Sequence, residues 1–213
     1  MTFLGLILTL VALASAAWAI FADHQGNRRL VYVLRPLTMV FVVLTALRNA
    51  PAAVFSYQIL IVAGLCGSLA GDVFMMLENK QVLAGMACFF VALSFYIWGF
   101  TKGIKASFVF WPLVILIVYA VAFTRKLFPY LGRKKIPVLL YVAAMTIMVW
   151  LAAERYNQIR EIHALSAYTG AVLFLISDSA WALDQFIRKH RHSQILILAS
   201  YFAAQVLIAL SVH

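Results

Sequence analysis

The chain has 213 residues, of which 65% are hydrophobic and only 11% are charged. Soluble domains are nearer half apolar and a quarter charged, so a soluble enzyme, a disordered chain and a small secreted scaffold are excluded. The net charge of +10 could indicate a nucleic-acid partner, but no basic stripe alternates with stacking aromatic residues as nucleic-acid modules require. We therefore expect an integral membrane protein whose surroundings are the lipid bilayer, with no nucleic-acid partner.

Apolar runs follow one another along the whole chain, separated by short segments that carry charges, glycine or proline. A spanning helix needs about 20 apolar residues, and continuous runs favour helices over the alternating strands of a membrane barrel. We expect an all-α polytopic protein with eight transmembrane helices. They form one integral membrane domain over residues 1–213, because no loop is long enough for a soluble domain. The expected helices cover roughly residues 2–22, 31–47, 55–77, 81–100, 107–123, 136–153, 164–186 and 194–212.

Lysine and arginine are unevenly distributed between the two sets of connections. Twelve of the seventeen lie in the odd-numbered connections and five in the even-numbered ones. Because cytoplasmic loops are enriched in these residues, we expect the odd connections in the cytoplasm and both termini on the non-cytoplasmic side. The expected location is the inner membrane of a bacterium.

A weak internal match suggests a duplication. Gly64 precedes Asp72 by eight positions in the third expected helix, and Gly170 precedes Asp178 by eight positions in the seventh. Since four helices return the chain to its starting side, a duplication would give two parallel four-helix repeats. The match rests on two positions in each half, so a bundle without internal repeats stays open as the alternative.

Asp72 and Asp178 are the acidic residues that we expect inside apolar helices. An aspartate at the centre of a spanning helix costs about 2.5–3.5 kcal/mol, so one kept there usually faces the bundle interior or a wet cavity. The third and seventh helices run in the same direction, which brings both carboxyls to the same depth. We expect a functional pair in one pocket; the alternative is that each carboxyl only accepts hydrogen bonds from a neighbouring helix. We place the other five acidic residues at helix ends or in loops: Asp23, Glu78, Glu154, Glu161 and Asp184.

Further polar residues would complete such a pocket. Arg35 is followed by Pro36, which suits the first turn of a helix, and we expect Arg35 at the cytoplasmic rim. It is a candidate phosphate or headgroup clamp, or else a topology anchor or a partner for Asp72. Tyr201 and Gln205 lie one turn apart on the eighth expected helix. They could orient water or substrate in the pocket wall, or only join helices.

One face of the third expected helix carries small and polar residues, which allow another backbone to come close. These residues are Gly64, Gly67, Ser68, Gly71 and Asp72. Isolated polar residues such as Tyr96 and Tyr141 are interpreted as packing or interface residues. Histidines are expected only in loops or at the terminus, which argues against a zinc hydrolase among the helices. They are His24, His163, His190, His192 and His213.

Five segments, taken in order and spacing, carry a family resemblance. They are Arg35-Pro-Leu-Thr38, Leu65-Cys-Gly-Ser-Leu-Ala-Gly-Asp72, Leu165-Ser-Ala-Tyr-Thr-Gly170, Leu173-Phe-Leu-Ile-Ser-Asp178 and Tyr201-Phe-Ala-Ala-Gln205. Together they resemble the YhhN-like family of integral membrane proteins. Animal members of that family are lysoplasmalogenases, which hydrolyse the vinyl ether bond of lysoplasmalogens to a fatty aldehyde and a glycerophospho-alcohol. One departure is Leu93, because similar sequences often carry a histidine at this position.

The resemblance implies a membrane-embedded hydrolase that acts on a lysophospholipid, a 1-alkenyl-glycerophosphoethanolamine or -choline. No metal or organic cofactor is needed, because protonation of the outer vinyl carbon gives an oxocarbenium-like cation to which water adds. Inverting glycosidases divide similar work between two carboxyls; here these would be Asp72 and Asp178, with either one as the acid. The expected substrate-binding residues are Arg35, Ser68, Ser177, Tyr201 and Gln205.

A second class of function explains the buried carboxyls equally well. A small proton-coupled transporter of lipids or amphiphiles would also place acidic residues in the membrane. Such transporters typically show inverted repeats with broken helices at matching positions, and the chain has no matching pair of glycine or proline breaks. A purely structural membrane protein is the third alternative.

Overall fold

The computed structural model describes residues 3–48, 55–77, 81–105, 109–188 and 193–212. This part of the chain forms eight α-helices, which confirms the all-α prediction, and two 3₁₀ turns, η2 (Phe128–Tyr130) and η3 (Gly132–Lys134), between α5 and α6. The helices are α1 (Phe3–His24), α2 (Arg28–Arg48), α3 (Phe55–Met76), α4 (Val82–Phe100), α5 (Phe110–Leu127), α6 (Lys135–Ile159), α7 (Ile162–Phe186) and α8 (Ser193–Leu210).

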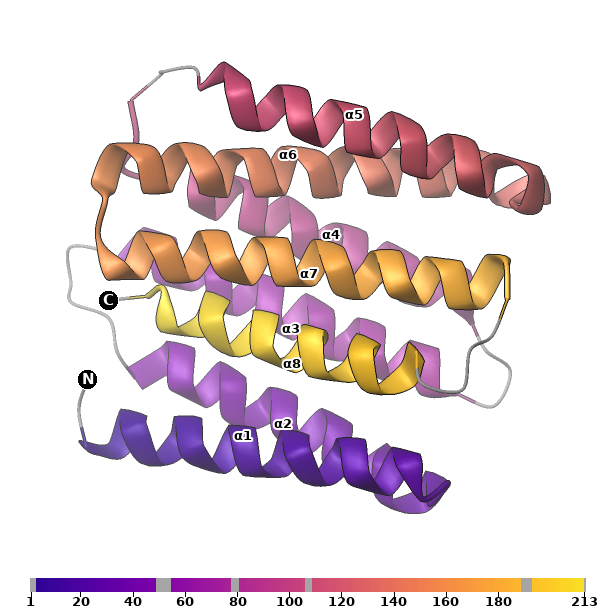
Figure 1. Ribbon diagram of the computed structural model, residues 1–213. Coiled ribbons are helices and arrows are strands. Elements are labelled where there is room, and N and C mark those ends of the chain that lie inside the picture. Colours follow the sequence, from indigo (N-terminus) through magenta and orange to yellow (C-terminus); the bar gives the residue numbers. More distant parts are fainter. Residues whose placement is uncertain (1–2, 49–54, 78–80, 106–108, 189–192, 213) are drawn as a thin grey trace.

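Seven of the eight helices in the described part are long and apolar enough to cross a bilayer. The exception is α7, which has 25 residues but a more polar sequence, with Asp178 and Asp184 in its second half. Figure 1 shows α7 alongside α6 and α8, at the same level of the bundle as its neighbours. The expectation of eight spans is therefore confirmed for seven helices, and α7 as the eighth span stays a prediction.

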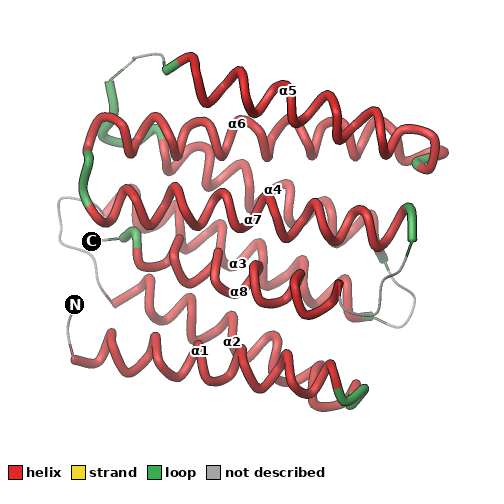
Figure 2. The backbone as a smooth tube through the Cα atoms, in the orientation of Figure 1, coloured by secondary structure: helices red, strands yellow, loops and turns green. Residues whose placement is uncertain are grey.

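The helices run antiparallel to their neighbours in the chain, so the bundle has two distinct ends (Figure 2). The helices α1, α3, α5 and α7 finish at one end of the bundle, which we call the odd end. The helices α2, α4, α6 and α8 begin there, on the right of Figures 1 and 2, and α1 begins and α8 finishes at the opposite end. The charge asymmetry predicts that the odd end faces the cytoplasm.

Close packing of α3 against α4 depends on the small residues of α3. A Cβ atom at Gly71 would lie 2.7 Å from the ring of Phe89, and a Cβ atom at Gly64 would overlap the ring of Tyr96. Both aromatic rings come from α4 and fill the space that the glycines leave. The small-residue face predicted from the sequence therefore does allow α4 to approach, whereas the suggested duplication of four helices stays a prediction.

The helix boundaries differ from the expected ones in α2, and this changes the position of Arg35. Because α2 begins at Arg28, Pro36 lies inside the helix and not in its first turn. Proline cannot donate a backbone hydrogen bond, but membrane helices tolerate this where neighbouring helices and side chains compensate. Arg35 is consequently held about two turns inside α2, deeper than the rim position that we expected. The expected start of the fifth helix at residue 107 lies outside the described residues.

Polar residues near the end of α6 lie in the helix and not in a loop. α6 continues to Ile159, so Glu154 is a helical residue that is only 2% exposed. Its carboxylate accepts hydrogen bonds of 2.9 Å from the backbone N–H of Val109 and from the side chain of Gln158. Glu154 was expected at a helix end or in a loop, but α6 continues for five residues beyond it; its two hydrogen bonds satisfy the charge inside the protein.

Two histidines lie in helices where loops were expected, whereas Asp184 lies at a helix end, as expected. Asp184 is buried in the last turn of α7, and His24 and His163 lie in the terminal turns of α1 and α7. His190 and His192 lie outside the described residues.

Candidate active site

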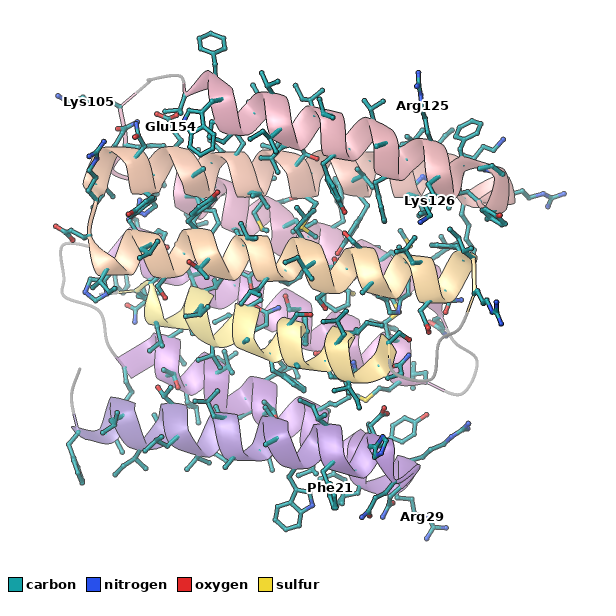
Figure 3. The ribbon with its side chains drawn as sticks, in the orientation of Figure 1. Phe21, Arg29, Lys105, Arg125, Lys126 and Glu154 are labelled. Atoms are coloured by element: carbon teal, nitrogen blue, oxygen red, sulfur yellow. The ribbon has the colours of Figure 1, made fainter. Side chains whose placement is uncertain are left out.

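A cavity of about 850 Å³ lies at the odd end of the bundle, lined by residues of α2 to α8 together with Asp23 and Gly26. Its rim includes the exposed residues Arg28 and Arg29 at the start of α2. Figure 3 shows Arg29 projecting outward at this end, opposite to the end that carries Lys105 and Glu154. The walls are largely apolar and rich in methionine, with Met75, Met76, Met86 and Met145. A polar rim above apolar walls is the arrangement that an amphiphile with a charged headgroup requires.

Asp72 and Asp178 both line this cavity, as their positions in the sequence predict. Asp72 is 2% exposed near the end of α3. Its Oδ2 accepts a 2.7 Å hydrogen bond from the hydroxyl of Tyr201 on α8, and its Oδ1 lies 3.8 Å from Nη2 of Arg35 on α2. Asp72 is therefore a carboxyl with both a cationic neighbour and a phenol donor.

Asp178 has different surroundings. Its Oδ2 accepts a hydrogen bond from the hydroxyl of Tyr141 on α6. No lysine or arginine of the described residues forms an ion pair with it. Next to it on α7, Ser179 shares a hydrogen bond with the hydroxyl of Tyr119 on α5. The two carboxyls thus share a cavity but differ in charge environment, which is the condition for a division of labour between an acid and a base.

The other predicted binding residues fall into two groups. Arg35, Ser177 and Tyr201 line the cavity, and the hydroxyl of Ser177 donates a 2.9 Å hydrogen bond to the carbonyl oxygen of Ile197. Ser68 and Gln205 are fully buried and are not among the lining residues. The expectation that Gln205 forms part of the wall is therefore wrong.

A buried polar layer explains the position of Gln205 and Ser68. The hydroxyl of Tyr96 donates a 2.8 Å hydrogen bond to Oε1 of Gln205 and lies 3.5 Å from Oγ of Ser68. Ser68 precedes Asp72 by one turn on α3, and Gln205 follows Tyr201 by one turn on α8. This layer therefore lies next to the pair formed by Asp72 and Tyr201, on the side away from the odd end, and can support it from within the core.

Comparison with known proteins gives a clear relationship. The YhhN family matches residues 30–212. The chain belongs to the YhhN family. It is 30% identical over 205 residues to the uncharacterized membrane protein YhhN of Escherichia coli O6:H1, covering 95% of this chain and 97% of that protein. No solved structure matches it.

This YhhN family member is also similar to animal proteins named lysoplasmalogenases. It is 35% identical over 159 residues to lysoplasmalogenase TMEM86A of Bos taurus, which covers 71% of this chain and 64% of that protein. It is 30% identical over 163 residues to lysoplasmalogenase TMEM86B of Homo sapiens, with 73% of this chain and 64% of that protein covered. The chain is thus a multi-pass membrane protein with distant homologues that are named for this activity.

Sequence reasoning missed several polar residues of the cavity in this YhhN family member, among them Tyr141, Tyr119 and Asp184. Tyr141 was interpreted as a packing residue, yet it donates to Asp178. Tyr141 lies six residues from the start of α6, and Asp178 lies eight residues from the end of α7, both counted from the odd end of the bundle. This similar depth is the signal that could have revealed the contact. Tyr119 lines the cavity from α5. Asp184 also lines it, 7% exposed, and accepts hydrogen bonds from Ser193 and Gln194 of α8.

Leu93, which occupies the position where similar sequences often carry a histidine, is fully buried in the main core and does not line the cavity. Within the described part of the chain, no three histidine, cysteine, aspartate or glutamate side chains are grouped to hold a metal ion. Catalysis without a metal stays a prediction.

Proposed function

We propose that this protein hydrolyses the vinyl ether bond of lysoplasmalogens, with Asp72 and Asp178 as its acid–base pair. The observation that carries the proposal is that Asp72 of α3 and Asp178 of α7 line one cavity, which has largely apolar walls and arginines at its rim. The distant homologues named lysoplasmalogenases support the same activity.

In this proposal Asp178 is the acid. It has no cationic partner among the described residues, and a nearby cation would favour its ionised form. With Tyr141 donating to Oδ2, Oδ1 is the oxygen that carries the proton. Asp178 transfers this proton to the outer carbon of the vinyl ether, and the electron pair of the double bond forms the new C–H bond. The other carbon becomes part of an oxocarbenium-like cation.

Asp72 is the carboxylate that completes the reaction. Arg35 and the hydroxyl of Tyr201 stabilise its charged form, because an opposite charge and a hydrogen-bond donor both favour an ionised carboxyl. Asp72 stabilises the cation and takes a proton from the water that adds to it. The resulting hemiacetal collapses to a fatty aldehyde and a glycerophospho-alcohol, and the two aspartates exchange protons with solvent to regain their starting states.

Headgroup binding is assigned to the arginines of α2. Arg28 and Arg29 lie at the rim, and Arg35 lies between the rim and Asp72. The side chain of Arg35 is 19% exposed and lines the cavity, so its guanidinium can donate to a phosphate oxygen while Nη2 faces Asp72. Guanidinium groups suit phosphate because their donors are arranged as a fork.

The direct test uses purified protein in detergent or liposomes with a 1-alkenyl lysophosphatidylethanolamine, and mass spectrometry to detect the fatty aldehyde. We expect aldehyde from the vinyl ether and none from the matching 1-alkyl ether, which cannot be protonated to an oxocarbenium ion. Absence of aldehyde from the vinyl ether, in a preparation that is folded and binds the lipid, would reject the proposed activity. Uptake of the unchanged lipid into liposomes would favour the transporter instead.

A further inference from the structure

The cavity is too short for a lipid chain to lie straight along the bundle. Leu175 and Met145 are among the lining residues farthest from the odd end. Leu175 precedes Asp178 by three residues and Met145 follows Tyr141 by four, which corresponds to about 4.5–6 Å of helix. A chain that fills one leaflet is about 15 Å long, half of the hydrocarbon core. A chain attached to a vinyl ether at the aspartates must therefore leave the cavity in another direction.

Aromatic residues close the inner end of the cavity. Phe89 and Tyr201 line it, with ring centroids 6.1 Å apart, and both rings pack on the fully buried Phe174 at 6.3 and 5.9 Å. Tyr96 packs on the other side of Phe174, with centroids 6.4 Å apart. Passage along the bundle axis would require this cluster to come apart.

The side of the cavity between α5 and α7 is built differently. α5 packs mainly on α6 and lies at the edge of the bundle in Figure 1, and its only buried residues are Pro112, Leu116 and Leu127. Tyr119 and Phe123 of α5 nevertheless line the cavity. Their rings stack with centroids 5.6 Å apart, and the hydroxyl of Tyr119 shares a hydrogen bond with Ser179 of α7. On this side, the side chains of Tyr119, Phe123 and Ser179 separate the cavity from lipid, because the α5 and α7 backbones are not closely packed against each other.

Two other pairs of neighbouring helices, α3 with α4 and α7 with α8, leave less room. α3 and α4 approach so closely that a Cβ atom at Gly71 would lie 2.7 Å from the ring of Phe89. On the other side, at the depth of Asp178, the hydroxyl of Ser177 on α7 donates a 2.9 Å hydrogen bond to the carbonyl oxygen of Ile197 on α8. A hydrocarbon chain cannot pass between helices packed at this distance.

We propose that the alkenyl chain of the bound lysolipid leaves the cavity sideways between α5 and α7, with Tyr119, Phe123 and Ser179 forming a portal to the bilayer. This inference rests on the proposed function for the identity of the lipid. The portal allows the headgroup to stay at the charged rim while the chain remains in hydrocarbon. It also gives the aldehyde product a direct route into the membrane.

The first experiment compares chain lengths. Ser179→Trp narrows the portal, and Ile176→Trp is the matched control on the same helix, because Ile176 is 42% exposed and does not line the cavity. Initial rates are measured on vinyl ether lysolipids with short and long chains. We expect Ser179→Trp to lower the long-to-short ratio of kcat/KM by about tenfold or more, the effect of excluding about two methylene groups, and Ile176→Trp to leave that ratio unchanged.

An unchanged ratio in Ser179→Trp would overturn the portal. If Ser179→Trp does not fold, Phe123→Trp narrows the portal from α5. An unchanged long-to-short ratio of kcat/KM in that variant would likewise overturn the portal.

The second experiment does not depend on turnover. Wild-type protein is irradiated with a lysophosphatidylethanolamine that carries a diazirine in the middle of its chain, and the labelled peptides are mapped. We expect labels on residues 119–123 and 178–183. Labels confined to α3, α4 or α8 would overturn the portal even if the protein releases aldehyde. Labels at the portal without any aldehyde release would support it while the proposed reaction fails.

Discussion

The hydroxyl of Tyr201 donates a 2.7 Å hydrogen bond to Oδ2 of Asp72 and thereby joins α8 to α3 beside the cavity. Oδ1 of the same carboxyl faces Arg35 at 3.8 Å. Asp72 is thus fixed from two sides, by a phenol and by a cation. In the proposed reaction this arrangement keeps one carboxylate ionised and oriented while Asp178 carries the proton.

Tyr201→Phe tests the contribution of the phenol. The substitution keeps the ring that packs on Phe89 and Phe174 and removes only the donor to Asp72. Hydrogen bonds to charged groups contribute about 1.5–3 kcal/mol, so we expect kcat for aldehyde release to fall by about ten- to a hundredfold. Tyr168→Phe is the control, because Tyr168 stacks on Tyr156 and does not line the cavity. Equal rates in the two variants would exclude a role of Tyr201 at Asp72.

The proposed role of Arg35 in headgroup binding can be tested with two variants that separate its positive charge from the shape of its guanidinium group. Arg35→Ala removes the proposed phosphate contact and should raise KM more than it lowers kcat. Arg35→Lys keeps the positive charge but loses the planar fork, so we expect a KM between those of the wild type and the alanine variant. Steady-state kinetics over a range of lysolipid concentrations measures both constants. A KM equal to that of the wild type in Arg35→Ala would contradict headgroup binding by this residue.

The glycine face of α3 predicts a stability effect. Gly71→Ala introduces a Cβ atom 2.7 Å from the ring of Phe89, and overpacking of this kind costs about 1–3 kcal/mol. We expect a lower midpoint of thermal unfolding in detergent. The matched substitution is Gly99→Ala, whose Cβ atom would lie 3.4 Å from Ile61, an ordinary contact. A Gly71→Ala variant as stable as Gly99→Ala would mean that α4 does not pack as described.

The orientation in the membrane is tested by labelling single cysteines in a variant without Cys66 and Cys88. Arg133→Cys lies at the odd end and Glu161→Cys at the opposite end, and both positions are exposed. From the charge asymmetry, we expect a membrane-impermeant maleimide added to intact cells to label position 161 and not position 133. The reverse pattern would contradict the predicted orientation.

The sequence predicted much of this fold for a simple reason. Apolar runs of about 20 residues admit few structures in a bilayer, so eight helices, with Asp72 and Asp178 at the same end of the bundle, follow from spacing alone. The end of α6 was harder to predict, because the charge of Glu154 is satisfied by contacts that arise only after packing. A charge that is paired in the tertiary structure is indistinguishable, in the sequence, from one in a loop.

The immediate partners of the aspartates also depend on helix neighbours that the sequence does not specify. Tyr141 meets Asp178 because α6 packs against α7, and Tyr201 meets Asp72 because α8 lies against α3. Gln205, one turn from Tyr201, points into the core because Tyr96 of α4 occupies the space beside it. A one-turn spacing on a helix predicts a shared face but not which neighbour covers each part of it.

The most direct test of the acid–base pair is the initial rate of fatty aldehyde release by Asp72→Asn, Asp178→Asn and the double variant. Asparagine keeps the size and polarity of the side chain, and size-exclusion profiles would verify that each variant is folded. We predict that each single variant loses about 10²–10⁴-fold in rate. The double variant should lose little more than the slower single variant, because residues that act as a unit are not additive. Turnover close to the wild type in either single variant would contradict catalysis by this pair.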